Sequence, residues 1–309
     1  LKLVHPELPF AVPRPQVFTL NQVNSCNIQT VRFPAGVHVS ERKTPALFGA
    51  KLIDDLPASA IIENERRQKL RWGLASSESL TTPVGRAARL ADGRIGRFGW
   101  KAQTASLNEF VQAACANELG LGNPAPSQPT PLSRASYQAP GIDLTLEQCH
   151  QITAFIGSLP RPIERPLVSS ESSSGEIETG RAAFVRIGCA DCHQPDVASL
   201  TGIYSDLLLH DMGPDGSGDG SYNDPSPEPT PVPELVGPRP GEWRTPPLWG
   251  VADAGPYLHD GRAATLEEAI AGHGGQGERS RAAFQTLAPA ERTRLLAFLG
   301  SLRAPDNRQ

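Results

Sequence analysis

One short segment, Cys189-Ala-Asp-Cys192-His193, constrains this chain more than any other feature. Two thiols at this spacing reach the two vinyl groups of one porphyrin and form thioethers, and the adjacent histidine is then held beneath the iron. A zinc site would need two further closely spaced ligands, and a thioredoxin-like pair would need a βαβ context; the sequence offers neither. The segment therefore predicts a covalent c-type haem with His193 as the proximal iron ligand.

The compartment and the classes of partner follow from the same motif and from the charge balance. Haem of this type is attached outside the cytoplasm, so we expect a periplasmic protein. The 309 residues carry 33 acidic and 29 basic side chains, for a formal charge of −4. This balance gives no basic surface for nucleic acid. No apolar run approaches the roughly 18 residues of a membrane span.

Three segments occur twice along the chain, in the same order, which indicates two related domains. The repeated pairs are Lys43–Gly49 with Arg244–Gly250, Trp100–Val111 with His259–Ile270, and Ala154–Pro160 with Ala297–Arg303. We expect an incomplete N-terminal cytochrome c-like domain over residues 1–165 and a C-terminal one over residues 176–309 that carries the haem.

The repeat also bears on the number of haems. In the second half, Cys189 precedes Arg244, and the same interval counted back from the equivalent Lys43 leads to a point before Leu1. The first domain's own haem motif is therefore missing from this chain. One covalent haem is expected here, and a second is expected in the full-length protein.

The local patterns are mainly helical. Ser106 and Thr265 are N-cap residues, each with a glutamate three positions on. Helical spacing of apolar residues predicts helices over about 145–159 and 289–302 and a short helix over 182–187. Residues 163–178 read as a Ser/Glu-rich linker and residues 213–241 as a long surface loop. The fold class is mainly α, as two tandem cytochrome c-like domains with long irregular loops.

Longer motifs resemble a known family. They are Tyr204–Gly213, Glu242–Gly250, Tyr257–Ala263 and His273–Gly275 in the second half, and Thr44–Gly49 and Gly96–Ala102 in the first. Over about residues 38–303 the chain resembles the di-haem oxidoreductase family, related to bacterial di-haem cytochrome c peroxidases and to the di-haem enzyme of methylamine utilisation. The resemblance implies two α-helical cytochrome c domains with the active site between two haems. One haem stores an electron, and the other meets peroxide.

Three residues compete for the sixth position on the iron of the Cys189–Cys192 haem. His273 stands where the resemblance places that ligand, in the loop that follows the His259 motif and its helix, and its flanking glycines let backbone approach a flat cofactor. Met212, the only methionine, and His210 are the alternatives. Two histidine ligands would give a lower potential than histidine and methionine.

The resemblance assigns roles to three further residues. Glu118 matches the active-site glutamate of the peroxidases, which moves a proton between the two peroxide oxygens; an ordinary helix carboxylate is the alternative. Trp100 matches the tryptophan between the two haems, or is a core residue. Arg244 is suited to a haem propionate, because its guanidinium binds a carboxylate through two nitrogens, or it lies on the surface.

These implications predict a periplasmic, peroxidase-like oxidoreductase. Electrons would pass from a small donor cytochrome or cupredoxin through the C-terminal haem to a catalytic haem at the domain interface, where peroxide or another small oxidant reacts. The alternatives are a non-catalytic electron-transfer cytochrome and an oxidase of a protein or organic substrate. Calcium between the domains is implied by the resemblance alone. Three questions stay open: whether the protein is a homodimer, whether this chain is active alone, and whether Cys115 and Cys149 form a disulfide.

Overall fold

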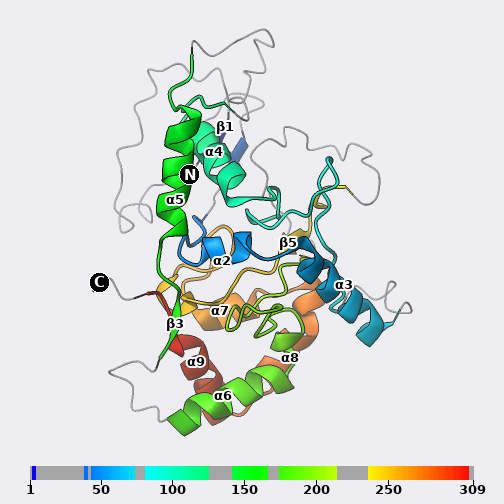
Figure 1. Cartoon of the computed structure of the whole chain (residues 1–309). Helices are drawn as coiled ribbons and strands as arrows, with labels where there is room; N and C mark the ends of the chain where they lie inside the picture. The colour runs from blue at the N-terminus through cyan, green and yellow to red at the C-terminus, as the bar shows by residue number, and fades with distance from the viewer. Residues whose placement is uncertain are drawn as a thin grey trace.

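The structure, a computed structural model, describes residues 2–4, 38–40, 43–73, 81–124, 141–165, 174–213 and 236–305. Its elements are β1 (Lys2–Val4), β2 (His38–Ser40), α2 (Ala50–Asp54), α3 (Ala58–Trp72), α4 (Leu107–Glu118), α5 (Leu146–Gly157), β3 (Ile163–Glu164), α6 (Ser174–Arg186), the 3-10 helix η3 (Cys189–Asp191), β4 (Leu209–Asp211), β5 (Glu242–Arg244), η5 (Val251–Asp253), α7 (Leu266–Ala271), η6 (Gly275–Gly277), α8 (Glu278–Gln285), α9 (Pro289–Ser301) and β6 (Leu302–Arg303). The fold is mainly helical with long irregular connections, as expected (Figure 1).

The strands are short and form three antiparallel pairs, β1 with β2, β3 with β6 and β4 with β5. None of them is long enough to make a sheet that could organise a core, so packed helices and loops do so instead. Within the described ranges, no helix combines the length and the apolar character that a membrane-spanning helix needs.

The predicted helix starts are confirmed. Thr145 and Thr265 form complete capping boxes at the starts of α5 and α7, and the Ser106 side chain accepts a hydrogen bond from the Glu109 backbone N–H at the start of α4. Such caps satisfy N–H groups that have no partner within the helix. The helix at the C-terminus, α9, begins with Pro289 in its first turn, a position where the missing proline N–H is not needed.

The linker predicted for residues 163–178 is wrong at both of its ends. Ile163 and Glu164 form β3, which pairs with β6, and α6 already begins at Ser174. Tertiary packing overrides the polar composition, because Ile177 is buried in the second core. Residues 166–173 lie outside the described residues, as does the part of the predicted long loop that spans 214–235.

Helices α6 and α9 pack against each other at the lower end of the molecule (Figure 1). Phe184 from α6 and Phe298 from α9 meet edge to face with ring centres 5.4 Å apart, and Tyr204 completes the group at 6.2 and 5.5 Å. The helices approach so closely at Gly180 that a Cβ there would lie 2.0 Å from the Arg294 carbonyl oxygen. This packing fixes the position of α6, the helix that precedes the Cys189–His193 segment in the sequence.

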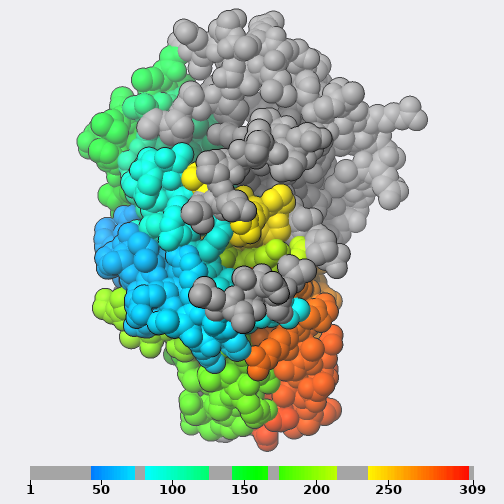
Figure 2. Space-filling model, turned by 90° about the vertical axis from the view of Figure 1, so that its right-hand side faces the viewer, coloured from blue at the N-terminus to red at the C-terminus, as the bar shows by residue number. Residues whose placement is uncertain are grey.

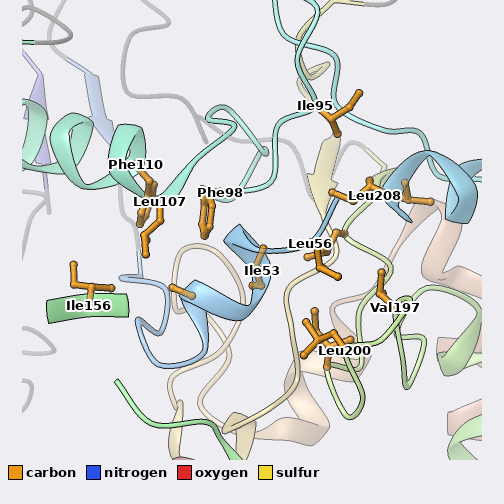
Figure 3. Packing of buried hydrophobic residues seen from close by; sticks show 14 of the residues in the cluster. Ile53, Leu56, Ile95, Phe98, Leu107, Phe110, Ile156, Val197, Leu200 and Leu208 are labelled. Carbon is orange, nitrogen blue, oxygen red and sulfur yellow. The ribbon is translucent and has the colours of Figure 1, made fainter. Parts of the chain in front are cut away.

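A larger core is built from both halves of the chain. Ile53, Leu107 and Phe110 come from the first half, whereas Val197 and Leu208 come from the second (Figure 3). Cys115 and Cys149, on the packed helices α4 and α5, are both buried and both free thiols in this structure. The halves therefore share apolar contacts as well as an internal repeat.

Polar contacts join the halves on the face shown in Figure 2, where the residues that follow 236 lie beside residues of the 81–124 range. Arg86 and Glu242 form an ion pair with a nitrogen–oxygen distance of 2.5 Å, and both side chains are largely buried. Nearby, the Lys101 ammonium group donates to the Pro240 carbonyl oxygen at 2.7 Å. These contacts fix the β4–β5 hairpin against the first half.

Candidate haem-binding site

The Cys189–His193 segment leaves α6 through a tight turn. Gly188 has φ +89°, and a Cβ there would lie 3.0 Å from an Asp191 carboxylate oxygen and 3.1 Å from the Ser280 hydroxyl, so glycine is needed at this position. The η3 turn follows, and the His193 N–H donates to the Cys189 carbonyl at 2.9 Å. Burial raises the pKa of the Cys189 thiol to about 12 and also raises that of Cys192. Both sulfurs are therefore held as neutral thiols.

His193 and His273 face each other. Their ring centres are 6.5 Å apart, with an angle of 59° between the ring planes. The Nδ1 of His193 lies 3.0 Å from the Tyr204 carbonyl oxygen, and the Nδ1 of His273 lies 2.8 Å from the Ala269 carbonyl oxygen. Because a carbonyl oxygen only accepts, each Nδ1 carries the hydrogen and each Nε2 keeps its lone pair.

Burial reinforces this state of the two rings. It lowers the pKa of His193 to about 4, with His273 as a further cause, and it lowers the pKa of His273 below the ordinary value. Both imidazoles are therefore neutral at pH 7, as a metal ligand must be.

The two rings fit the axial positions of one metal ion. A bond from a metal to an imidazole nitrogen is about 2.0 to 2.1 Å long, so two imidazoles on opposite sides of one ion have ring centres roughly 6 Å apart. The hydrogen bond from the other ring nitrogen to a backbone carbonyl is the usual support of a ligating histidine. Cys189, Cys192, His193 and His273 are thus the residues that could hold a haem.

The alternative sixth ligands are placed differently. Met212 lies beside the loop of His273. The Met212 Cε and the His273 Cβ are both close to Gly277, at 3.2 Å and 3.0 Å from the position that a Cβ on this glycine would take. His210 has both ring nitrogens engaged, Nε2 at 2.8 Å from Asp206 Oδ2 and Nδ1 at 2.7 Å from Gln276 Oε1. In this arrangement His210 offers no free nitrogen to iron.

Arg244 lies in the interior, at 6% exposure, and not on the surface. Its Nε donates to the Gly99 carbonyl at 3.0 Å, and burial lowers its pKa to about 10. No described carboxylate comes within ion-pair distance of its guanidinium. The Asp206 carboxylate acts on it only from beyond ion-pair distance and does not offset the cost of burial, so the site fits a directly paired anion such as a haem propionate.

Trp100 adjoins Arg244. Its backbone carbonyl accepts the Arg244 N–H at 2.9 Å, and its indole N–H donates to the Lys43 carbonyl at 2.8 Å. Glu118 stands apart from this group, exposed at the last position of α4. The structure thus brings Trp100 together with Arg244, and it places Glu118 on a separate element.

Sequence reasoning missed two features near the haem-binding segment. The His210 ring has two hydrogen-bond partners, Asp206, at 0% exposure, and Gln276. Trp243, opposite His210 in the β4–β5 hairpin, stacks on His259 with ring centres 3.7 Å apart. A signal for Asp206 existed, since it precedes His210 by four positions within the Tyr204–Gly213 motif; no comparable signal marks Gln276.

The expected calcium ion finds no support among the residues that the structure describes. The only cluster of three potential metal-binding side chains within those ranges is Cys192, Asp206 and His210. Calcium takes oxygen ligands, whereas this cluster offers one thiol, one imidazole and one carboxylate.

Comparison with known proteins adds the family. The family described as di-haem oxidoreductase, putative peroxidase, matches residues 8–302. No curated protein matches the chain. One similar solved structure is a MauG-like protein associated with microbial copper homeostasis, with 18% identity, a TM-score of 0.39, and coverage of 88% of this chain and 94% of that chain. Another is the hydrazine synthase of Kuenenia stuttgartiensis, with 19% identity, a TM-score of 0.36, and coverage of 94% and 100%. With the family match spanning nearly its whole length, this chain belongs to the di-haem oxidoreductase family.

Proposed function

We propose that this chain is a periplasmic, peroxidase-like haem oxidoreductase in which Cys189 and Cys192 attach haem c and His193 and His273 are its axial ligands. The observation that carries the proposal is the pair of facing, neutral imidazoles, each tied through Nδ1 to a backbone carbonyl. When bound, haem supplies reversible one-electron chemistry at iron. His193 and His273 would both hold this haem, so it would serve to pass electrons and would leave no place for peroxide.

The repeat favours an open position in the first half. The interval that leads from His259 to His273 leads from the equivalent Trp100 to Ala114. Helix α7 ends at Ala271, before His273, whereas α4 continues through Ala114. Alanine has no donor atom, so a second haem held by the first half would lack a protein ligand there. This contrast supports peroxide chemistry in preference to electron transfer alone.

The remaining residues divide between electron and proton transfer. Arg244 binds a haem propionate with its buried guanidinium, and Trp100, hydrogen-bonded to the Arg244 backbone, lies on the electron path between the two halves. Glu118 handles the peroxide proton. Electrons enter from a small cytochrome or cupredoxin. The covalent haem implies the periplasm, where such attachment takes place.

The test is to express the gene with its native upstream sequence in a host that matures c-type cytochromes, and to count haems that survive denaturation. We expect two covalent haems, one low-spin and inert to peroxide, the other high-spin and oxidised by peroxide in stopped-flow spectra. A single low-spin haem that is inert to peroxide would leave the electron-carrier alternative. Haem that is released on denaturation would contradict attachment through Cys189 and Cys192.

A further inference from the structure

A buried histidine other than the two facing ones lies beside the haem-binding segment. His210 is 2% exposed, and its Nδ1 lies 3.6 Å from the Cys192 sulfur. Its Nε2 contacts Asp206 Oδ2 at 2.8 Å and its Nδ1 contacts Gln276 Oε1 at 2.7 Å. The Gln276 amide is oriented independently, because its Nε2 donates to the Val84 carbonyl at 3.1 Å. Both partners of His210 are therefore acceptors, and the ring donates from both nitrogens.

The Asp206 end of this chain of hydrogen bonds is fixed to the haem-binding segment. The Asp206 N–H donates to the Cys192 carbonyl at 2.9 Å, and its Oδ2 also accepts from Gln68 Nε2 at 2.6 Å. Gln68, on α3, donates to the Asp191 carbonyl at 2.9 Å as well. Asp206 is thus anchored on both sides and cannot follow a movement of His210.

The Gln276 end belongs to the loop that carries His273. This loop holds four glycines, Gly272, Gly274, Gly275 and Gly277. Glycines contribute no side chains to hold a loop in one conformation, and they make its ordering costly in entropy. Between them, the Gln276 side chain links the loop to His210 on one side and to the Val84 carbonyl on the other, beside the close backbone packing of Gly274 and Gly275 on Met212.

We propose that His210 is a positioning residue for the sixth iron ligand. Through Gln276 it ties the His273 loop to Asp206, and through Asp206 to the segment that presents Cys192 and His193. The distance between the two facing imidazoles is then set by a series of hydrogen bonds in addition to the glycine-rich loop itself. This inference rests on the proposed haem ligation by His193 and His273.

The test compares the holoprotein with variants in which the hydrogen bond to His210 is cut or kept. Gln276→Met removes the acceptor for His210, whereas Gln276→Glu keeps one. Gln285→Met, at the exposed end of α8, is the matched control. The readouts are the low-spin fraction by EPR and the rate at which cyanide replaces the sixth ligand, which reports how often His273 leaves the iron.

We expect cyanide to bind about tenfold faster or more in Gln276→Met, because a hydrogen bond from a charged donor contributes that order of stabilisation. Gln276→Glu should give a rate between those of the wild type and Gln276→Met, because it keeps the acceptor for His210 but loses the bond to the Val84 carbonyl. Gln285→Met should leave the rate unchanged. Equal rates in the wild type and Gln276→Met would overturn the proposal. If Gln276→Met does not fold, His210→Gln supplies the second measurement, with the same expected acceleration and the same contradicting result.

The failure of the ligand assignment is distinguishable from the failure of this inference. A haem that stays low-spin in His273→Ala would refute ligation by His273, and with it the positioning role of His210. A haem that becomes high-spin in His273→Ala, together with an unchanged cyanide rate in Gln276→Met, would refute only the positioning role.

Discussion

The Lys43 backbone N–H donates to the His259 carbonyl oxygen at 2.8 Å, across the two halves of the chain. The repeat supplies its counterpart, because Arg244 is equivalent to Lys43, Trp100 is equivalent to His259, and the Arg244 N–H donates to the Trp100 carbonyl at 2.9 Å. Each half thus gives the same donor to the same acceptor of the other half. This reciprocal pair fixes how the half that contains Cys189 and Cys192 lies against the half that contains Trp100.

The same exchange occurs between two glycines and two aromatic rings. Gly49 and Gly250 are equivalent in the repeat and have φ +75° and +73°. A Cβ on Gly49 would lie 2.7 Å from a ring carbon of Trp249, and a Cβ on Gly250 would lie 2.5 Å from a ring carbon of Phe48. Each glycine therefore serves both a left-handed backbone and a close approach from the other half.

We expect Gly49→Ala to destabilise the protein more than backbone strain alone predicts. The left-handed backbone costs an alanine about 1 to 2 kcal/mol, and the clash with Trp249 adds about 1 to 3 kcal/mol of overpacking. Gly93→Ala is the control, since Gly93 has φ +83° and nothing within 4 Å of its Cβ position. Urea denaturation followed by circular dichroism gives both free energies of unfolding; equal losses would show that the contact with Trp249 is not tight.

The proposed ligation by His193 and His273 can be tested through the spin state and the midpoint potential of the haem. His273→Met should keep the haem six-coordinate and raise its midpoint potential, because a thioether ligand favours ferrous iron. His193→Ala should abolish the normal low-spin spectrum, whereas Met212→Leu should leave it intact. Redox titration and EPR of the three variants decide the point. A high-spin haem in Met212→Leu would move the sixth ligand to the methionine.

The ion pair between Arg86 and Glu242 should make the free energy of unfolding depend on pH. Burial alone would raise the pKa of Glu242, but the hydrogen bonds from Arg86 and from the Arg239 backbone N–H, with the charges of both arginines, together hold the pKa below its usual value of 4.5. A carboxyl group whose pKa is lower in the folded state adds stability that is present above the unfolded pKa and is lost as the pH falls through the folded pKa. The stabilisation should therefore be complete at pH 7 and should disappear progressively below about 4.5.

Arg86→Met tests this dependence. It removes the guanidinium from a buried carboxylate and leaves the Arg239 backbone N–H as a remaining partner, which should lower the free energy of unfolding at pH 7 by up to about 3 kcal/mol. The difference from the wild type should shrink as the pH falls below 4.5, because the protonated carboxyl group no longer needs the cation. Arg186→Met, which removes an exposed ion pair with Glu291, should show little effect at either pH. A difference that stays constant down to pH 3 would contradict the role of the pair.

Local patterns predicted α4, α5, α7 and α9 but missed α2, α3 and α8 and gave only the end of α6, and they predicted the partners across the chain less well. Thr145 and Thr265 identify helix starts because a cap involves residues three positions apart. The partner of Arg86 lies 156 residues away, at a distance along the chain that no local pattern encodes. Asp206 and His210 are four positions apart but do not lie on a helix. They converge because Leu207 adopts φ +59°, a conformation that a leucine rarely takes and that its sequence does not announce.

The last prediction concerns Glu118 and its place on α4. Glu118 follows Ala114 by four positions, so the two lie on the same face of the helix, one turn apart. Counted on from the repeated block, Ala114 falls at the position of His273, so in our proposal the Glu118 carboxylate shares the helix face nearest the open position of a second haem. The sequence assigned Glu118 an active-site role only through the family resemblance, and its position on α4 adds a geometric argument for that role.

In a preparation that holds two haems, Glu118→Gln should slow peroxide turnover by roughly 10²- to 10⁴-fold, the usual contribution of a positioned acid–base group. Its stability should be equal or slightly higher, because a negative charge at the C-terminal end of a helix is opposed by the helix dipole. Glu147→Gln, an exposed carboxylate in the first turn of α5, is the control and should leave turnover unchanged. Steady-state peroxide assays beside urea denaturation separate the two effects. Turnover that is unchanged in Glu118→Gln would remove this carboxylate from the chemistry and leave the proton transfer to water or to another residue.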